Sequence, residues 1–444
     1  MISHPLLEGL GMVGVRLGLE RIRTFLEVLG EPHLCAPAVH IAGTNGKGST
    51  TAFVTQALVE AGYTVGTTVS PHIQILNERV QINGVPVDDA TLSEAIEHVD
   101  RARWSWAEAA GIQGHPLSYF EFMLAVAFQV FAWRGVDVMV VEVGLGGRLD
   151  ATNVVQPVVS AVTSIGLDHT DVLGDTLEKI AIEKAGIFRR GVPVVAGALP
   201  EEARQVVTHR CQSLGCELWM AGPRLRREQR RDGTWSFATP MGGVQGVRLG
   251  LRGVHQGSNA LTALAILHRL RSLGFLLPDD AIVRGLSGAF LPGRLEQLRP
   301  GLVADGAHNP LGGRALAAWL SQRPKPGWRI LLLGMGRDRD PVPFVEPLVP
   351  YVDEIVTVQA AHPKARDPTE LAMELQDFDV ELAAGGTVDE TLPEVFVEAL
   401  ETIVTGSLFV AGAARAVVTE GVLDGLQAGQ GPLDGDAERP EEEA

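Results

Sequence analysis

The sequence predicts an α/β protein with two domains. The first is an N-terminal P-loop nucleotide-binding domain with a mostly parallel sheet plus a small antiparallel subsheet, and the second is a C-terminal Rossmann-like α/β domain. Apolar strand-like runs alternate with helical segments, the first run leads through a glycine-rich loop into a helix, and the alternation breaks at residues 291–294 before it resumes. We therefore expect domains at 1–297 and 298–428 and an acidic, disordered tail at 429–444.

The elements of the first domain follow from their sequence patterns. Residues 136–143 form a nearly continuous apolar run, which is typical of a strand buried in a parallel sheet, and Asn83-Gly84 predicts a hairpin turn within an extended stretch at 77–87. The other expected strands are 38–42, 63–69, 158–165 and 192–196, and the expected helices are 88–109, 118–133, 177–185, 259–273 and an amphipathic helix at 49–61. Short alternating segments at 215–252 predict the antiparallel subsheet.

The second domain repeats the alternation of strands and helices. Its expected strands are 301–304, 329–333, 354–358 and 408–411. Doubly wound domains bind ligands at the carboxyl ends of their strands, so we expect the functional residues there.

Residues 40–51, His-Ile-Ala-Gly-Thr-Asn-Gly-Lys-Gly-Ser-Thr-Thr, carry the clearest chemical signal. Three glycines let backbone N–H groups approach phosphate oxygens, and the N-terminus of the following helix adds a partial positive charge. Lys47 supplies a full charge, and Ser49 or Thr50 can reach a phosphate-bound magnesium ion. The loop differs from a Walker A motif because Gly48 separates Lys47 from Ser49. It predicts a nucleoside triphosphate site, with a plain glycine turn as the alternative.

Polar residues also stand at the ends of three expected strands. Glu142 closes an apolar strand, and Ser70 and His169 each lie just beyond another strand. A carboxylate at a strand end is well placed to bind magnesium, a hard cation that prefers oxygen ligands. Each residue alone is as well explained as an exposed polar residue at a strand end. Their common position beside a phosphate loop favours a metal site.

Lys184 lies near the end of the helix expected at 177–185. On residue chemistry alone it is a cation favoured by the dipole at the C-terminus of a helix.

The overall composition excludes several classes of protein. The chain has 444 residues and a formal net charge of −17, which argues against a general nucleic-acid binder. Its three cysteines form neither a disulfide framework nor a zinc-ligand pattern. There is no signal-peptide pattern and no apolar run long enough to span a membrane, so we expect a cytoplasmic protein.

Taken together, the motifs resemble the Mur-ligase-like ATP-dependent amide ligases, most closely the folylpolyglutamate synthase/dihydrofolate synthase family. The resemblance covers roughly residues 13 to 420 in unbroken order. It is carried by the segments 43–50, 70–72, 77–80, 118–121, 142–153, 167–171, 183–187, 291–294, 305–310 and 406–409.

The resemblance implies roles for individual residues toward ATP and Mg²⁺. The ATP phosphates would be held by Thr44, Asn45, Gly46, Lys47, Gly48 and Ser49. The metal ligands would be Ser70, Glu142 and His169. A monovalent cation is a further candidate cofactor. Lys184 would be carbamylated by carbon dioxide. Asn259 would contact adenine, Arg294 and Asp305 would be interdomain ATP contacts, and His308 would lie nearby in the catalytic site.

For the pterin substrate, the family's pockets correspond to Leu17, Gly18, Ser118, Tyr119, Phe120, Glu121, Leu149, Asp150 and Ala151. The chain departs from the family at three positions. Arg16 replaces an acidic residue of a related bifunctional pattern, Ser118 replaces a common threonine, and Ala413 lies where a glutamate is frequent. These differences concern the choice of acid acceptor and leave the ATP chemistry unchanged.

The implied activity is ATP-dependent ligation of L-glutamate to dihydropteroate, or to reduced folate, through an acyl phosphate. His72 and His308 are candidates to assist removal of the amine proton. The alternatives are a ligase of the same superfamily that acts on a peptidoglycan precursor, a P-loop ATPase without ligase activity and a bare nucleotide-binding module. The resemblance implies small-molecule partners only and a monomer.

Overall fold

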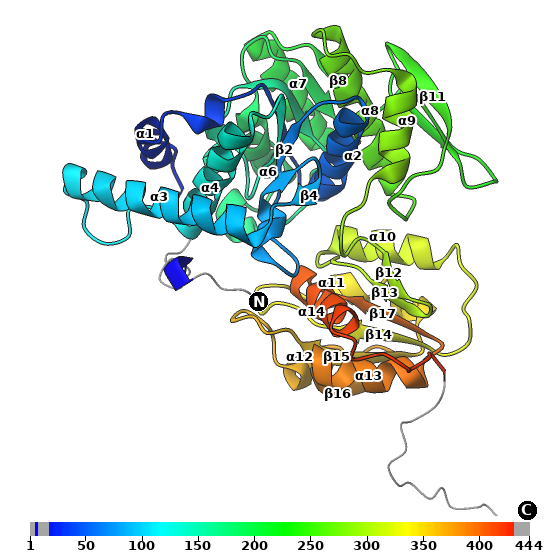
Figure 1. Ribbon diagram of the computed structural model, residues 1–444. Coiled ribbons are helices and arrows are strands. Elements are labelled where there is room, and N and C mark those ends of the chain that lie inside the picture. The colour runs from blue at the N-terminus through cyan, green and yellow to red at the C-terminus, as the bar shows by residue number, and fades with distance from the viewer. Residues whose placement is uncertain (1–4, 8–16, 430–444) are drawn as a thin grey trace, which may run out of the picture. The chain divides into compact units, whose positions relative to one another are not determined.

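The computed structural model describes residues 5–7 and 17–429. The chain divides into two compact units, Met1–Leu291 and Pro292–Ala444, which are described separately (Figure 1). The division falls a few residues before the expected boundary at 297, because β12 (Glu296–Arg299) pairs with β13 (Leu302–Ala304) of the second unit. Position 16 and the expected tail beyond Gly429 lie outside the described residues.

The first unit is built on an eight-stranded sheet with the order β4-β3-β2-β5-β1-β6-β7-β8. The central strand β1 (Ala38–Ala42) lies between β5 (Val138–Glu142) and β6 (Pro157–Val162), parallel to both. The parallel part continues through β2 (Val65–Thr68), β7 (Val194–Ala196) and β8 (Leu218–Met220). The hairpin of β3 (Gln81–Ile82) and β4 (Val85–Pro86) turns at Asn83-Gly84, as predicted. The carboxyl ends of the parallel strands therefore meet at one edge.

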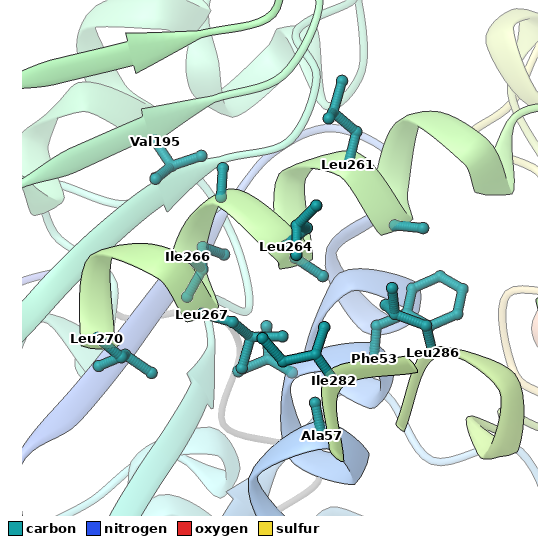
Figure 2. Packing of buried hydrophobic residues seen from close by; sticks show 14 of the residues in the cluster. Phe53, Ala57, Val195, Leu261, Leu264, Ile266, Leu267, Leu270, Ile282 and Leu286 are labelled. Carbon is teal, nitrogen blue, oxygen red and sulfur yellow. The ribbon is translucent and has the colours of Figure 1, made fainter. Parts of the chain in front are cut away.

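Helices cover both faces of this sheet. On one face α2 (Lys47–Glu60), α8 (Gln256–Ser272) and α9 (Asp279–Gly288) bury Val39 and Ile41 of β1, and Figure 2 shows Phe53 of α2 against Ile282 and Leu286 of α9. On the other face α1 (Glu20–Val28), α3 (Asp89–Ala110) and α4 (Tyr119–Arg134) share a core with alternate residues of β5. Packing on several sides explains why α2, which begins at Lys47 instead of Ser49, is not the simple amphipathic helix expected.

The region at 215–252 forms the antiparallel subsheet only in part. β8 joins the large sheet parallel to β7, so the prediction was wrong for this first segment. The subsheet proper contains β9 (Arg226–Gln229), β10 (Trp235–Thr239) and β11 (Gly242–Val247). Between β6 and β8 the chain forms α5 (Thr170–Leu173), α6 (Leu177–Lys184) and α7 (Glu201–Leu214).

The second unit is a six-stranded sheet with the order β12-β13-β17-β14-β15-β16, parallel except for β12. Its other strands are β14 (Arg329–Leu333), β15 (Glu354–Gln359), β16 (Glu381–Thr387) and β17 (Glu401–Thr405). Its helices are α10 (Pro310–Leu320), α11 (Val342–Val345), α12 (Pro368–Glu374), α13 (Val388–Glu398) and α14 (Leu408–Thr419).

The strand predicted at 408–411 was wrong, since these residues open α14 and the strand is β17 just before them. Gly406 turns the chain with a φ of 96°, and the Ser407 hydroxyl accepts a hydrogen bond from the Phe409 N–H at the start of the helix. A short apolar run fits a buried strand and a buried helix equally well, so periodicity could not separate the two.

Candidate active site

The phosphate loop, residues 43–46, joins β1 to α2 and is held by the segment that follows β6. The Thr44 N–H donates to the Ser164 carbonyl oxygen at 2.8 Å, and the Asn45 N–H donates to the Ser164 hydroxyl at 3.0 Å. The Thr163 hydroxyl in turn donates to the Asn45 carbonyl oxygen at 2.7 Å. The loop backbone is thus fixed by the protein itself. The sequence patterns did not single out Thr163 and Ser164, although both lie within a predicted strand that ends beside the loop.

Two glycines of the loop are required by close contacts. Gly46 has a φ of 84°, and a Cβ there would lie 2.3 Å from Oδ1 of Asn259. A Cβ at Gly43 would lie 1.9 Å from the Thr163 hydroxyl oxygen. Asn259 comes from the first turn of α8, and its amide donates to Oε1 of Gln256 at 2.9 Å. The residue predicted to contact the nucleotide base therefore lies against the phosphate loop.

Two lysines converge on one carbonyl oxygen of this loop. The ammonium groups of Lys47 and Lys184 donate to the Gly43 carbonyl oxygen at 3.0 and 3.1 Å. Lys184 is only 5% exposed, and burial, with a smaller contribution from the charge of Lys47, lowers its pKa from 10.5 to about 7. Lys184 is therefore a buried amine beside the phosphate loop and not a solvated cation at a helix end.

Glu142 lies next to the first turn of α2. It is the last residue of β5 and is only 6% exposed. A Cβ at Gly48 would lie 3.4 Å from its Oε2, so the carboxylate faces the helix N-terminus directly. Gly48, the residue that separates this loop from a Walker A motif, keeps the space between helix and carboxylate open.

Ser70 and His169 follow strands at the same edge of the sheet. Ser70 lies two residues beyond β2, whose Thr68 pairs with Val141 of β5. His169 precedes α5 with a φ of 49°, and its Nε2 lies 3.8 Å from Oδ1 of Asp168. Within the described ranges no three His, Cys, Asp or Glu side chains gather as a metal cluster. The predicted set of Ser70, Glu142 and His169 contains only two residues of these types, so it would supply a hydroxyl, a carboxylate and an imidazole nitrogen, with water completing the coordination.

The N-terminus of α4 is capped by two of the predicted substrate residues, Ser118 and Glu121. The Ser118 hydroxyl and backbone N–H both donate to Oε2 of Glu121, at 2.7 and 2.8 Å. The other oxygen of Glu121 accepts from Arg21 of α1, at 2.8 Å. The polar groups of Ser118 and Glu121 are thus used in a capping box and an ion pair. Tyr119 and Phe120 between them remain half-buried aromatic surfaces.

Asp150 fixes the glycine-rich loop after β5. Its Oδ2 accepts from the Leu145 N–H at 2.8 Å, and its Oδ1 accepts from the Thr152 N–H at 3.0 Å. The hydroxyl oxygen of Thr152 also lies 2.9 Å from Nε2 of the buried His40 of β1. Phe120 packs onto the same loop, since a Cβ at Gly144 would lie 2.6 Å from its ring.

An arginine without a predicted role stands beside these residues. Nε of Arg79 donates to Nδ1 of His72 at 2.9 Å, and its guanidinium lies 5.3 Å from the centroid of the Tyr119 ring. Burial and then the charge of Arg79 lower the pKa of His72 to about 4, so His72 is a weak base near neutral pH. The motif at 77–80 already contained Arg79, but only tertiary contacts show what it touches.

The predicted residues of the second unit gather around the backbone that follows β13. The carboxylate of Asp305 accepts from the N–H groups of Leu295 and Ala307, each at 2.9 Å. A Cβ at Gly306 would lie 2.7 Å from a guanidinium nitrogen of Arg294. Nδ1 of His308 lies 2.8 Å from the Gly306 carbonyl oxygen. These residues form one cluster at the carboxyl end of a strand.

Known families match both units. The Mur ligase middle domain matches residues 119–267, and the glutamate ligase domain of Mur ligases matches residues 293–415. The chain is 40% identical over 327 residues to the dihydrofolate synthase/folylpolyglutamate synthase of Bacillus subtilis, with 70% of this chain and 73% of that protein covered. The enzyme of the same name from Mycobacterium tuberculosis is 34% identical, with 90% and 89% covered.

The chain belongs to the folylpolyglutamate synthase/dihydrofolate synthase family. It is an ATP-dependent ligase of folate metabolism. Solved structures agree with this membership. Escherichia coli FolC in complex with DHPP and ADP has a TM-score of 0.84 and 32% identity, with 94% of this chain and 98% of that chain covered. The bifunctional synthase of Yersinia pestis, complexed with AMPPNP and a Mn ion, has a TM-score of 0.82 and 33% identity, with 94% and 98% covered.

The remaining predicted substrate residues of this ligase belong to the first unit. Leu17 and Gly18 precede α1, and Leu17 is half exposed. Leu149 and Ala151 flank Asp150, and Ala151 is buried. Within the described residues, no helix of the ligase is long and apolar enough to cross a membrane.

Proposed function

We propose that this ligase joins L-glutamate to dihydropteroate and extends reduced folates by further glutamates, converting ATP to ADP and phosphate. The observation that carries the proposal is the set of charges around the phosphate loop. Lys47 and the buried amine of Lys184 meet at the Gly43 carbonyl oxygen, and the buried carboxylate of Glu142 faces Gly48. A site of this kind suits transfer of a terminal phosphoryl group.

We propose ATP and Mg²⁺ as the nucleotide and the divalent cation. Relatives have been solved with ADP, with AMPPNP and with Mn. Ser70, Glu142 and His169 would hold the ion, and a buried carboxylate beside a helix N-terminus, together with a hydroxyl, suits a hard cation that keeps several waters. When bound, the ion would neutralise part of the phosphate charge. We assign ATP contacts to Asn259, Arg294 and Asp305.

The chemistry follows from the weakness of a carboxylate as an electrophile. An oxygen of the substrate carboxylate attacks the terminal phosphorus of ATP. The bond between that phosphorus and the oxygen of ADP breaks, and an acyl phosphate forms. The amine of glutamate then attacks the acyl carbon and an amide bond forms. The bond between the acyl carbon and the phosphate oxygen breaks, phosphate leaves, and the amine proton passes to the solvent or the departing phosphate. Lys47 and the loop N–H groups would stabilise the charge on the phosphoryl group. His72, whose pKa is about 4, is a poor base, so of the two histidines His308 is the better candidate to relay the amine proton.

We propose that Lys184 carries a carbamate in the working enzyme. Only a neutral amine can attack carbon dioxide, and a pKa of about 7 leaves about half of Lys184 neutral at pH 7, against well under one part in a thousand for an ordinary lysine. The nitrogen–carbon bond forms as one proton is released, and the cation becomes an anion. Such an anion would support the metal and the γ-phosphate region.

We propose that the acceptor binds over Tyr119 and Phe120. The ring of Phe120 lies beside the loop fixed by Asp150, and the ring of Tyr119 lies beside Arg79. Leu17, Gly18, Leu149 and Ala151 would complete the pocket. In this proposal Ser118 and Glu121 act by setting the direction of α4, because their polar atoms cap it. The enzyme would act as a monomer, with residues 1–297 binding ATP and 298–428 contributing the glutamate-ligase domain.

The test is phosphate release in the presence of ATP, magnesium and glutamate, with dihydropteroate compared with tetrahydrofolate. We expect release to require both glutamate and one of these acceptors. Release without glutamate would identify an ATPase, and release only with a peptidoglycan precursor would identify a different Mur-type ligase.

The carbamate has its own test. Lys184→Ala should lose most of the turnover and recover part of it with a short carboxylate such as acetate, because the carboxylate restores the missing negative charge. Undiminished turnover in Lys184→Ala would exclude a carbamate role for Lys184.

A further inference from the structure

A cavity in the first unit is lined by residues of α6 and α7 and of the segments beside them. We call it the α6–α7 cavity, and both helices are labelled in Figure 1. Its volume is about 480 Å³, within the range of small-molecule sites. The side chains that shape it are Arg148, Ile182, Gln205, Val206, His209 and Arg210. Among the described residues that line it, none carries a carboxylate.

The wall of this cavity carries two arginines, Arg148 and Arg210, in a chain whose net charge is −17. Arg148 pairs with Glu183 at 2.8 Å, whereas no ion pair or hydrogen bond of the Arg210 guanidinium is found in the described part of the chain. Arg210 therefore offers a cation to an anion bound in the cavity.

The floor of the cavity is apolar. Ile182 is 54% exposed although it belongs to a packed helix, and Val206 of α7 is only partly buried. A ligand with an apolar body would remove this surface from water, while Arg148 and Arg210 offer planar donor pairs that match carboxylates. An inorganic anion would use the arginines and leave the floor exposed.

We propose that the α6–α7 cavity is a binding site for an acylated glutamate, an aromatic body that carries two carboxylates, separate from the phosphate-loop site. The choice of ligand rests on the proposed function, since the substrates and products of glutamate ligation carry such a group. The cavity and its charge do not depend on it.

Occupancy of the cavity acts on the residues next to Lys184. The cavity wall includes Ala185 and Gly186, which directly follow Lys184. The Arg148 N–H donates to the Glu183 carbonyl oxygen at 2.8 Å, and a Cβ at Gly186 would lie 2.3 Å from the Cβ of Arg148. A ligand that draws the Arg148 guanidinium away from the Glu183 carboxylate would therefore act beside the backbone that positions Lys184. Binding of product in the cavity is expected to slow turnover.

The experiment is titration calorimetry of the full chain with N-(4-aminobenzoyl)-L-glutamate. We expect Arg210→Ala and Val206→Trp each to weaken a binding event at least tenfold. Arg204→Ala is the matched control, because Arg204 lies on the same helix but pairs with Glu201 and does not line the cavity. Equal binding by the wild type and all three variants would overturn the proposal. Any binding at the substrate pocket is common to all of them and cancels in the comparison.

Two further probes test the class of ligand. Glutamate alone and inorganic phosphate should each bind the cavity at least tenfold more weakly than the aromatic probe. Equal binding of either one would overturn the assignment to an acylated glutamate. Phosphate release measured on the same variants separates the two proposals. Normal glutamate-dependent release with no effect of Arg210→Ala on binding rejects the cavity alone, and binding that depends on Arg210 without any ligase activity rejects the proposed function alone.

Discussion

Replacing Lys184 by methionine should stabilise the fold while it removes activity. Burial lowers the pKa of Lys184 from 10.5 to about 7, which corresponds to a cost of about 5 kcal/mol in folding free energy when the lysine is charged. Methionine has a similar length and carries no charge, but it loses the hydrogen bond to the Gly43 carbonyl oxygen, worth about 1–2 kcal/mol. We therefore expect Lys184→Met to gain about 3 kcal/mol at pH 7.

The pH dependence gives this prediction a definite sign. Between pH 7 and pH 10.5 the unfolded chain binds more protons at Lys184 than the folded chain does, so the stability of the wild type rises with pH in that window. The variant has no group that titrates at this position. Its advantage should therefore shrink steadily above pH 7 and disappear by about pH 10.

The assay is urea unfolding followed by tryptophan fluorescence, in buffers depleted of carbon dioxide so that Lys184 stays a free amine. Lys179→Met is the control, because Lys179 lies on the same helix with its side chain 60% exposed in an ion pair with Asp175. It should change stability by no more than about 0.5 kcal/mol. A destabilised Lys184→Met at pH 7, or a difference that does not vary with pH, would refute the reasoning.

Three further predictions concern the metal ligand, the phosphate loop and the second unit. Glu142→Gln should lower turnover at least about 100-fold with an unchanged circular dichroism spectrum, since it removes the carboxylate that faces the first turn of α2. Wild-type rates would remove Glu142 from the metal site. Gly46→Ala should abolish nucleotide binding in a fluorescence titration, because the Cβ of the alanine would collide with the side chain of Asn259. Gly62→Ala is the control and should bind normally, since Gly62 has a similar φ of 92° but open space where the Cβ would lie. Glu401→Gln should destabilise the second unit by about 3–5 kcal/mol in thermal unfolding, because it removes the charge that balances the buried Arg329. The control Glu374→Gln, at a partly exposed ion pair, should cost under about 1 kcal/mol.

The sequence by itself determined the features that depend on local chemistry. The phosphate loop could be predicted because glycines, a lysine and hydroxyl side chains occur together between an apolar strand and a helix. Most strands of the large sheet were readable because continuous apolar runs are needed where both faces are buried. The order of motifs also indicated the family, which the matches to known proteins confirm.

Features that depend on distant contacts were decided only by the tertiary structure. The apolar run at 408–411 satisfied both helix and strand patterns, and the turn at Gly406 with the Ser407 cap made it a helix. The stretch at 215–252 was divided because β8 found a parallel partner in β7. Residue chemistry alone predicted that Lys184 is an ordinary cation at a helix end. Its environment is set by Gly43 and Lys47, which lie far away in sequence. The pKa of a side chain depends on the groups around it, and at Lys184 only folding brings those groups together. The electrostatics of the site therefore could not be predicted from the sequence pattern.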